Sequence, residues 1–181
     1  MGRAGRDQAG FSLAELLVVV AILGLVMGGA FTLLAASQQS YAFGAARVEA
    51  QQAARVGLER MVRELREAGY DPTGAGFAAI EAAEPTRVVF QRDLNGNGVI
   101  DPTRERVSFL LRGTVLRRDA GGGAQPLVEG VRRLTFTYYD RDGAGTTNPA
   151  RVASIRILLE AGPTGPAVVL ESQATIRNRS P

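Results

Sequence analysis

The hydrophobic and polar positions follow two different patterns before and after about residue 70. Residues 11–36 (FSLAELLVVVAILGLVMGGAFTLLAA) are apolar almost without interruption, and Glu15 is their single charged residue. At about 1.5 Å per residue, a helix of this length can cross a hydrocarbon core of about 30 Å. A secretory signal has a shorter apolar core of about 7–15 residues. We therefore expect residues 11–36 to form a transmembrane helix.

Residues 37–69 continue the helix in amphipathic form. They are rich in helix-favouring Ala, Gln, Glu, Arg and Leu, and their apolar residues recur at steps of three and four. This apolar stripe comprises Ala54, Leu58, Met61, Leu65 and Ala68. Opposite charges four positions apart predict ion pairs on the other face, namely Glu59 with Arg63, Arg60 with Glu64 and Arg63 with Glu67. Gly69 and Pro72 predict the helix end.

Residues 70–181 show short β-rich runs between turn residues and are predicted to form a β-rich globular head. The predicted strands are Arg87–Arg92, Arg106–Arg112, Thr114–Arg118, Gln125–Glu129, Arg132–Asp140, Arg151–Glu160 and Ala167–Arg177. Gly113 predicts a tight hairpin. Alternation of apolar and polar positions indicates a half-buried antiparallel sheet, which the apolar helix stripe can cover. The prediction is an α+β fold in which a long N-terminal helix packs on a C-terminal antiparallel β-sheet domain.

Residues 1–10 (MGRAGRDQAG) form a short polar segment directly before the apolar run. Arg3 and Arg6 lie in this segment, so the positive-inside rule places the N-terminus in the cytoplasm and the bulk of the chain outside. We therefore expect a single-pass membrane protein.

The residues Gly10-Phe11-Ser12-Leu13-Ala14-Glu15 resemble the prepilin peptidase motif of type IV pilin-like proteins. The resemblance implies a leader at residues 1–10, cleavage between Gly10 and Phe11 by prepilin peptidase, and N-methylation of Phe11. It also implies a bacterial inner-membrane protein with a periplasmic C-terminal domain, which joins other pilins or pseudopilins in a filament. The segments QQAARVGLERMVRELREAGYDP, DLNGNGVID, PLVEGVRRLTFTYYD and ATIRN look like those of PilW-type minor pilins and J-type minor pseudopilins of type II secretion.

Glu15 is a candidate assembly residue. An unpaired acid at the centre of a membrane helix costs about 2.5–3.5 kcal/mol, so a lone carboxylate there needs a reason. Cleavage before Phe11 would expose an amine four residues away, which Glu15 can neutralise in its own chain or in a neighbour. The alternative is a tolerated interfacial acid on an ordinary signal anchor.

Gly24 and Gly28 form a GxxxG spacing, which allows two helices to approach closely. Glycine is also common in membrane helices generally, so specific packing and mere composition both fit this pattern.

Residues 93–101 (DLNGNGVID) match the start of an EF-hand calcium loop. The candidate Ca²⁺ ligands are the side chains of Asp93, Asn95, Asn97 and Asp101 and the carbonyl of Val99. The twelfth position is Arg104 rather than a bidentate Glu, and only Glu105 or Asp119 offers a substitute. The alternative is a metal-free hairpin connection in which Asn-Gly supplies positive φ.

Composition argues against an enzyme. The chain of 181 residues contains no Cys and no His, and all its cations are Arg, so the commonest general bases and several nucleophiles are missing. A net charge of +3 does not by itself indicate nucleic acid. A DNA-binding minor pilin acting in DNA uptake is the alternative function, carried by Arg117-Arg118 and Arg132-Arg133, but adjacent strand residues point to opposite faces. We expect a structural filament subunit.

Overall fold

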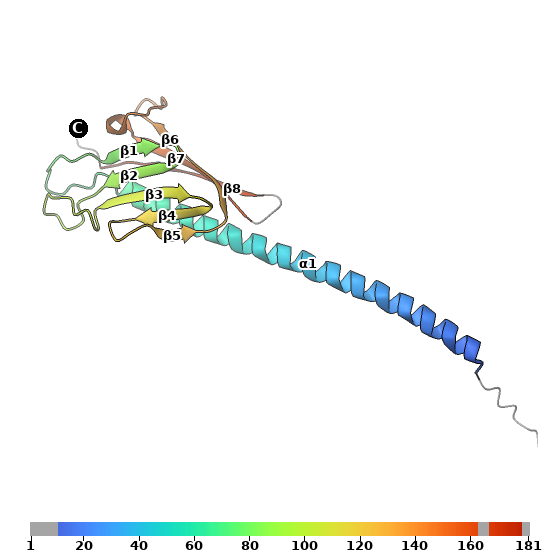
Figure 1. The fold of residues 1–181 in the computed structure, drawn as a ribbon. Coiled ribbons are helices and arrows are strands. Elements are labelled where there is room, and N and C mark those ends of the chain that lie inside the picture. The colour runs from blue at the N-terminus through green and yellow to red at the C-terminus, as the bar shows by residue number, and fades with distance from the viewer. Residues whose placement is uncertain (1–10, 163–166, 179–181) are drawn as a thin grey trace, which may run out of the picture. The chain divides into compact units, whose positions relative to one another are not determined.

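The computed structural model describes residues 11–162 and 167–178 and has an α+β architecture (Figure 1). Within these residues the elements are α1 (Leu13–Arg66), β1 (Ile80–Glu84), β2 (Arg87–Gln91), β3 (Arg106–Arg112), β4 (Val115–Asp119), β5 (Gln125–Val128), β6 (Val131–Tyr139), the short 3-10 helix η1 (Pro149–Arg151), β7 (Ser154–Ala161) and β8 (Val168–Thr175). The predicted long helix and antiparallel strands are confirmed. The sequence missed β1, whose Ile-Glu-Ala-Ala-Glu run is poor in β-branched and aromatic residues.

Contacts divide the chain into two compact units, residues 1–44 and residues 45–181. In the described part of the first unit, every side chain of α1 from Leu13 to Gly44 is exposed. In the second unit α1 is amphipathic and buries one face. This change follows the sequence, which turns from uniformly apolar to periodic.

The predicted apolar stripe is the buried face of α1. Its five residues, Ala54 to Ala68, are at most 7% exposed. Gly57 lies on the same face, and a Cβ there would stand 2.2 Å from Val128 Cγ2. Glycine at this position therefore lets the helix approach β5 closely.

The charged residues of α1 depart from the prediction. Of the three predicted ion pairs, one is formed among the described residues: Arg60 Nε lies 2.9 Å from Glu64 Oε1. Glu64 is moreover buried, because it lies beside the apolar stripe and faces the sheet rather than solvent. The helix ends as predicted: Gly69 has φ +74°, and its N–H donates to the Gln91 carbonyl at 2.8 Å.

The strands form two antiparallel sheets rather than the single sheet expected. One has the order β1-β2-β3-β4-β5 and the other β6-β7-β8. The chain turns at Gly130 after β5, and the Val131 N–H then donates to the Thr114 carbonyl at 2.9 Å. As a result β6 pairs with β7 and not with β5. The hairpin at Gly113, between β3 and β4, is confirmed.

Polar contacts join the two sheets near the start of β2. The Phe136 N–H donates to the Pro85 carbonyl at 2.7 Å. The Tyr138 hydroxyl donates to the carbonyls of Glu84 and Arg87, at 2.7 and 3.1 Å. Burial and the nearby Glu84 charge raise the pKa of Tyr138 well above its usual value. A single core then runs from the helix stripe through both sheets.

Candidate functional site

The start of α1 carries the predicted processing residues. Phe11 is 81% exposed and precedes the helix, while Gly10 lies outside the described residues. The Ser12 hydroxyl oxygen accepts a bond from the Ala14 N–H at 3.3 Å, and the Ser12 carbonyl accepts one from Leu16 at 3.1 Å. Ser12 thus caps the helix, and Phe11 is left outside it.

Glu15 lies in the first turn of α1 and is exposed. A carboxylate in the first turn is stabilised by the partial positive charge of a helix N-terminus. Between Phe11 and Glu49 the sequence contains no other acid. The structure therefore puts one isolated negative charge about one turn from Phe11, at the end of an apolar helix.

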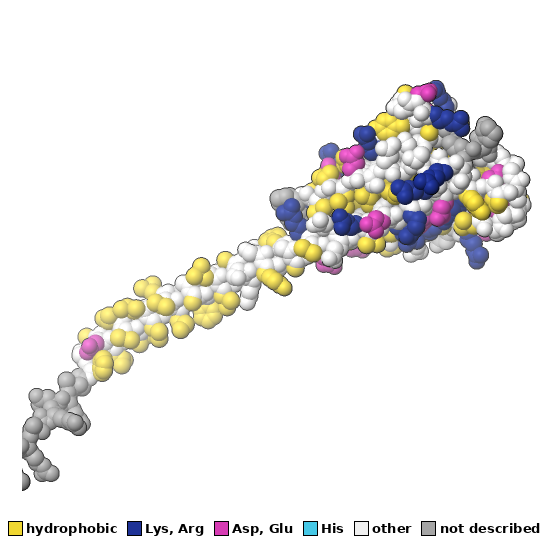
Figure 2. All heavy atoms as spheres, turned by 180° about the vertical axis from the view of Figure 1, so that it is seen from behind, with side chains coloured by type: hydrophobic (Ala, Val, Ile, Leu, Met, Phe, Trp, Pro, Cys, Tyr) yellow, Lys and Arg dark blue, Asp and Glu magenta, His cyan; other side chains and the backbone are white. Residues whose placement is uncertain are grey.

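The apolar segment that follows is the membrane-spanning candidate. Its most apolar window has a mean hydropathy of 2.6, and no part of that window is buried. Figure 2 shows hydrophobic side chains along the visible face of this segment. Gly24 and Gly28 also lie open, with nothing within 4 Å of a Cβ built at either position. The surface needed for lipid or for other helices is thus fully available.

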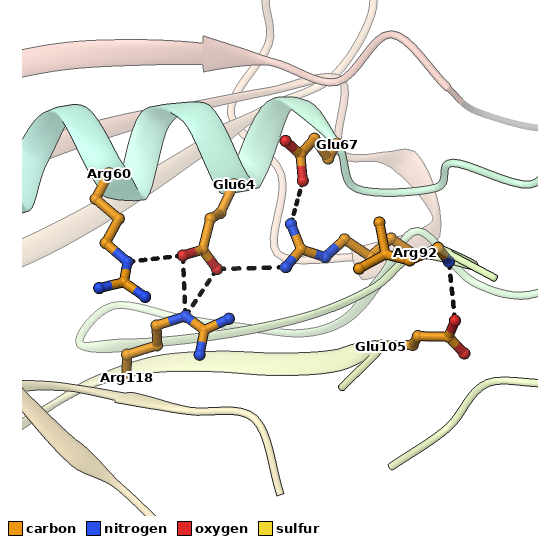
Figure 3. Close-up of polar contacts among 7 residues, drawn as sticks. Arg60, Glu64, Glu67, Arg92, Glu105 and Arg118 are labelled. Carbon is orange, nitrogen blue, oxygen red and sulfur yellow. Dashed lines mark hydrogen bonds and ion pairs between the residues drawn. The ribbon is translucent and has the colours of Figure 1, made fainter. Parts of the chain in front are cut away.

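A buried ion cluster in the second unit ties α1 to the five-stranded sheet (Figure 3). Glu64 receives Arg118 Nε at 2.8 Å and Arg60 Nε at 2.9 Å, and Arg92 Nη2 stands 3.7 Å away. Arg92 also pairs with Glu67. Helical spacing predicted only the Arg60–Glu64 pair of this cluster, because its other contacts join residues as far as 54 positions apart.

The calcium-like loop is folded by its own backbone N–H groups. The buried Asp93 carboxylate accepts the N–H groups of Gly96, Asn97 and Gly98, at 2.7, 3.3 and 2.8 Å. Asn95, Asn97 and Asp101 each accept the N–H two residues further on, at 2.8–2.9 Å. The predicted ligand side chains are therefore brought to one loop, where they serve as turn acceptors.

Glu105 completes this loop. Its side chain is buried and accepts the N–H groups of Leu94, Asn95 and Asp101, at 2.9, 3.1 and 2.8 Å. The described residues contain no group of three or more His, Cys, Asp or Glu side chains that could hold a metal ion. These contacts account for the loop as a hairpin connection, and its binding of Ca²⁺ stays a prediction.

The two arginine dipeptides make contacts within the chain. Their partners are Glu64 for Arg118, the Ala124 carbonyl for Arg117, the Gly162 carbonyl for Arg132 and Glu160 for Arg133. These contacts hold the guanidinium groups against different parts of the second unit. They do not favour a shared phosphate-binding surface, which needs several cations aligned on one face.

A comparison with known protein families finds a match for the N-terminal segment. Residues 5–34 match the family described as the prokaryotic N-terminal methylation motif. The match covers Gly10, Phe11 and Glu15 and the GxxxG pair, and it ends inside the apolar run. A comparison with curated proteins finds no match. By this motif, joined to a long helix packed on antiparallel sheets, the chain is type IV pilin-like.

Proposed function

We propose that this protein is a minor pilin or pseudopilin subunit of a type IV pilus or a type II secretion pseudopilus. Prepilin peptidase cuts it between Gly10 and Phe11, Phe11 is N-methylated, and the helix then passes from the inner membrane into a filament. One observation carries the proposal: a methylation motif opens a fully exposed apolar helix whose lone carboxylate lies one turn from Phe11.

The charge of Glu15 explains how such a helix can leave the lipid. After cleavage Phe11 has an α-amine, which has a pKa of about 7.7–8.0 and is mostly cationic at neutral pH. Two unit charges 4 Å apart attract by about 4 kcal/mol at an effective dielectric constant of 20, against about 1 kcal/mol in water. Pairing with the Phe11 amine of its own or a neighbouring chain therefore stabilises Glu15 most strongly inside a filament.

Topology and subtype are part of the same proposal. Arg3 and Arg6 keep the leader in the cytoplasm, so residues 45–181 lie in the periplasm. Gly24 and Gly28 let the apolar helices of neighbouring subunits approach closely. The likeness to PilW-type and J-type sequences indicates a low-copy subunit that primes or caps the filament.

Two experiments test the proposal. Co-expression with prepilin peptidase followed by mass spectrometry should give a chain that starts at methylated Phe11; a chain that starts elsewhere refutes the cleavage site. Glu15→Gln should leave membrane insertion intact and reduce incorporation into filaments, because it removes the charge and keeps the shape. Glu49→Gln, an exposed site on the same helix, is the matched control. Equal incorporation of both variants contradicts the assembly role.

A further inference from the structure

A groove lies between α1 and the edge of the three-stranded sheet, entirely within the second unit. It has a volume of about 780 Å³ and an apolar floor that includes Leu58, Val62 and Leu170. Its wall on one side is the helix, and on the other it is β8. The groove is therefore bounded by a strand that stands at the end of its sheet.

Among the described residues no strand pairs with the outer edge of β8, and this edge is regular. The other sheet ends carry a register shift, at Ile80/Ala82 in β1, at Leu116/Arg117 opposite β5 and at Val131/Arg133 in β6. β8 pairs with β7 over eight positions without a shift, and it contains no Pro and no basic residue. Proteins usually blunt exposed edges with such devices, so an edge without them is suited to pairing with another strand.

The direction of the free backbone groups follows from the register. The Ile176 N–H donates to the Ala153 carbonyl at 2.9 Å. Hydrogen-bonded pairs alternate along an antiparallel ladder, so even-numbered residues of β8 bond to β7. The peptide groups of Val169, Glu171 and Gln173 therefore point outward. A further strand placed there would extend the sheet over the exposed side of α1.

The groove carries an excess of unpaired positive charge. Four of its arginines are exposed and have no ion-pair partner among the described residues: Arg55, Arg63, Arg66 and Arg177. Of its three acids, Glu67 pairs with Arg92 and Glu171 with Arg156, which leaves Glu59. Figure 2 shows arginine side chains gathered on one face of the globular unit, with fewer acidic ones among them.

We propose that β8 and this groove bind an extended acidic segment of a partner protein by strand addition. The partner's backbone pairs with the outward peptide groups of β8, and its carboxylates meet the four arginines. Strand addition takes affinity from main-chain bonds and specificity from alternate side chains. We infer from the proposed function that this partner is a neighbouring filament subunit. The binding of an acidic strand does not depend on that function.

A labelled peptide of four Glu-Val repeats tests the site, by fluorescence anisotropy with the full chain in a non-ionic detergent. Arg63→Glu combined with Arg66→Glu should weaken binding at least about tenfold, because it reverses two charges on the groove wall. The matched control combines Arg112→Glu with Arg141→Glu, two exposed arginines away from the groove, and should bind like the unaltered chain.

The backbone contribution is tested separately. Glu171→Pro removes one outward N–H and should weaken binding at least about tenfold relative to Glu171→Ala, which keeps it. Circular dichroism checks that both variants are folded, and a peptide with alternate N-methylated amides tests the same bonds from the partner's side.

Three results overturn the proposal: no peptide binding, equal binding of the N-methylated peptide, or tighter binding of single-stranded oligothymidine, which would assign the groove to phosphates. None of these three results bears on cleavage before Phe11. The strand-addition proposal can therefore fail without the proposed function failing.

Discussion

Replacing Glu64 by alanine removes the carboxylate at the centre of the buried ion cluster. The Glu64 side chain is 9% exposed, and that of Arg92 is 8% exposed. Without Glu64, Arg92 keeps only Glu67 as an acidic partner, and Arg118 loses the carboxylate that it contacts at 2.8 Å. The variant therefore leaves Arg118 without an acidic partner among the described residues and Arg92 with one partner fewer, at the contact between α1 and the five-stranded sheet.

The expected loss follows from the cost of an unpaired buried charge. Removing one partner of a buried ion pair costs about 3–5 kcal/mol. Arg118 is 20% exposed and Arg60 43%, so both can recover part of their hydration. We therefore expect Glu64→Ala to lower the free energy of unfolding by about 3 kcal/mol, near the lower limit of this range. That is a large share of the total, which is about 5–15 kcal/mol for most proteins.

Urea unfolding of the full chain in non-ionic detergent measures this loss. The chain has four Tyr and no Trp, so tyrosine fluorescence reports on it, and urea does not screen charges as guanidinium does. Glu59→Ala is the matched control, because Glu59 is exposed on the same helix, and it should change stability by less than about 0.5 kcal/mol. Glu64→Leu combined with Arg118→Leu should lower the free energy of unfolding less than Glu64→Ala alone. The double variant removes both partners of this ion pair, so Arg118 is not left as an unpaired charge.

The reasoning is wrong if Glu64→Ala and Glu59→Ala destabilise equally. It is also wrong if the double leucine variant is less stable than Glu64→Ala, since that result would make the pair itself the source of stability.

Two further predictions concern single polar groups. Because burial raises the pKa of Tyr138, the contribution of this residue to folding stability should be constant up to the unfolded value of about 10 and then fall by up to about 1.4 kcal/mol per pH unit. Tyr138→Phe should flatten the slope above pH of about 10 at a cost of about 1 kcal/mol, and an unchanged slope would contradict the assignment. Calcium should raise the melting temperature of the chain by less than about 1 °C, because the Asp93 and Glu105 carboxylates already accept six backbone N–H groups; a calcium-dependent rise that Asp93→Asn abolishes would instead support the predicted calcium site.

Local patterns determined the elements of this protein. An uninterrupted apolar run and a three-to-four-residue period are properties of consecutive residues, so α1 and its buried stripe could be predicted, as could its end at Gly69. The motif around Phe11 and Glu15 is equally local, and it carries the proposed function. Alternation within each run likewise predicted most of the strands, but β1, with its small residues, gave no such signal.

Only the tertiary structure decided how the strands divide and what the charges do. Strand alternation is the same in one sheet or two, so the separation of β6 from β5 depends on the turn at Gly130 and on packing. Glu64 looked like a solvent-facing residue because helical spacing pairs it with Arg60, yet its position beside the stripe places it against Arg118 of a distant strand. Contacts between residues far apart in the chain leave no periodic signal. For this reason the contacts of Glu64 with Arg92 and Arg118, the loop contacts of Glu105 and the free edge of β8 emerged only from the folded protein.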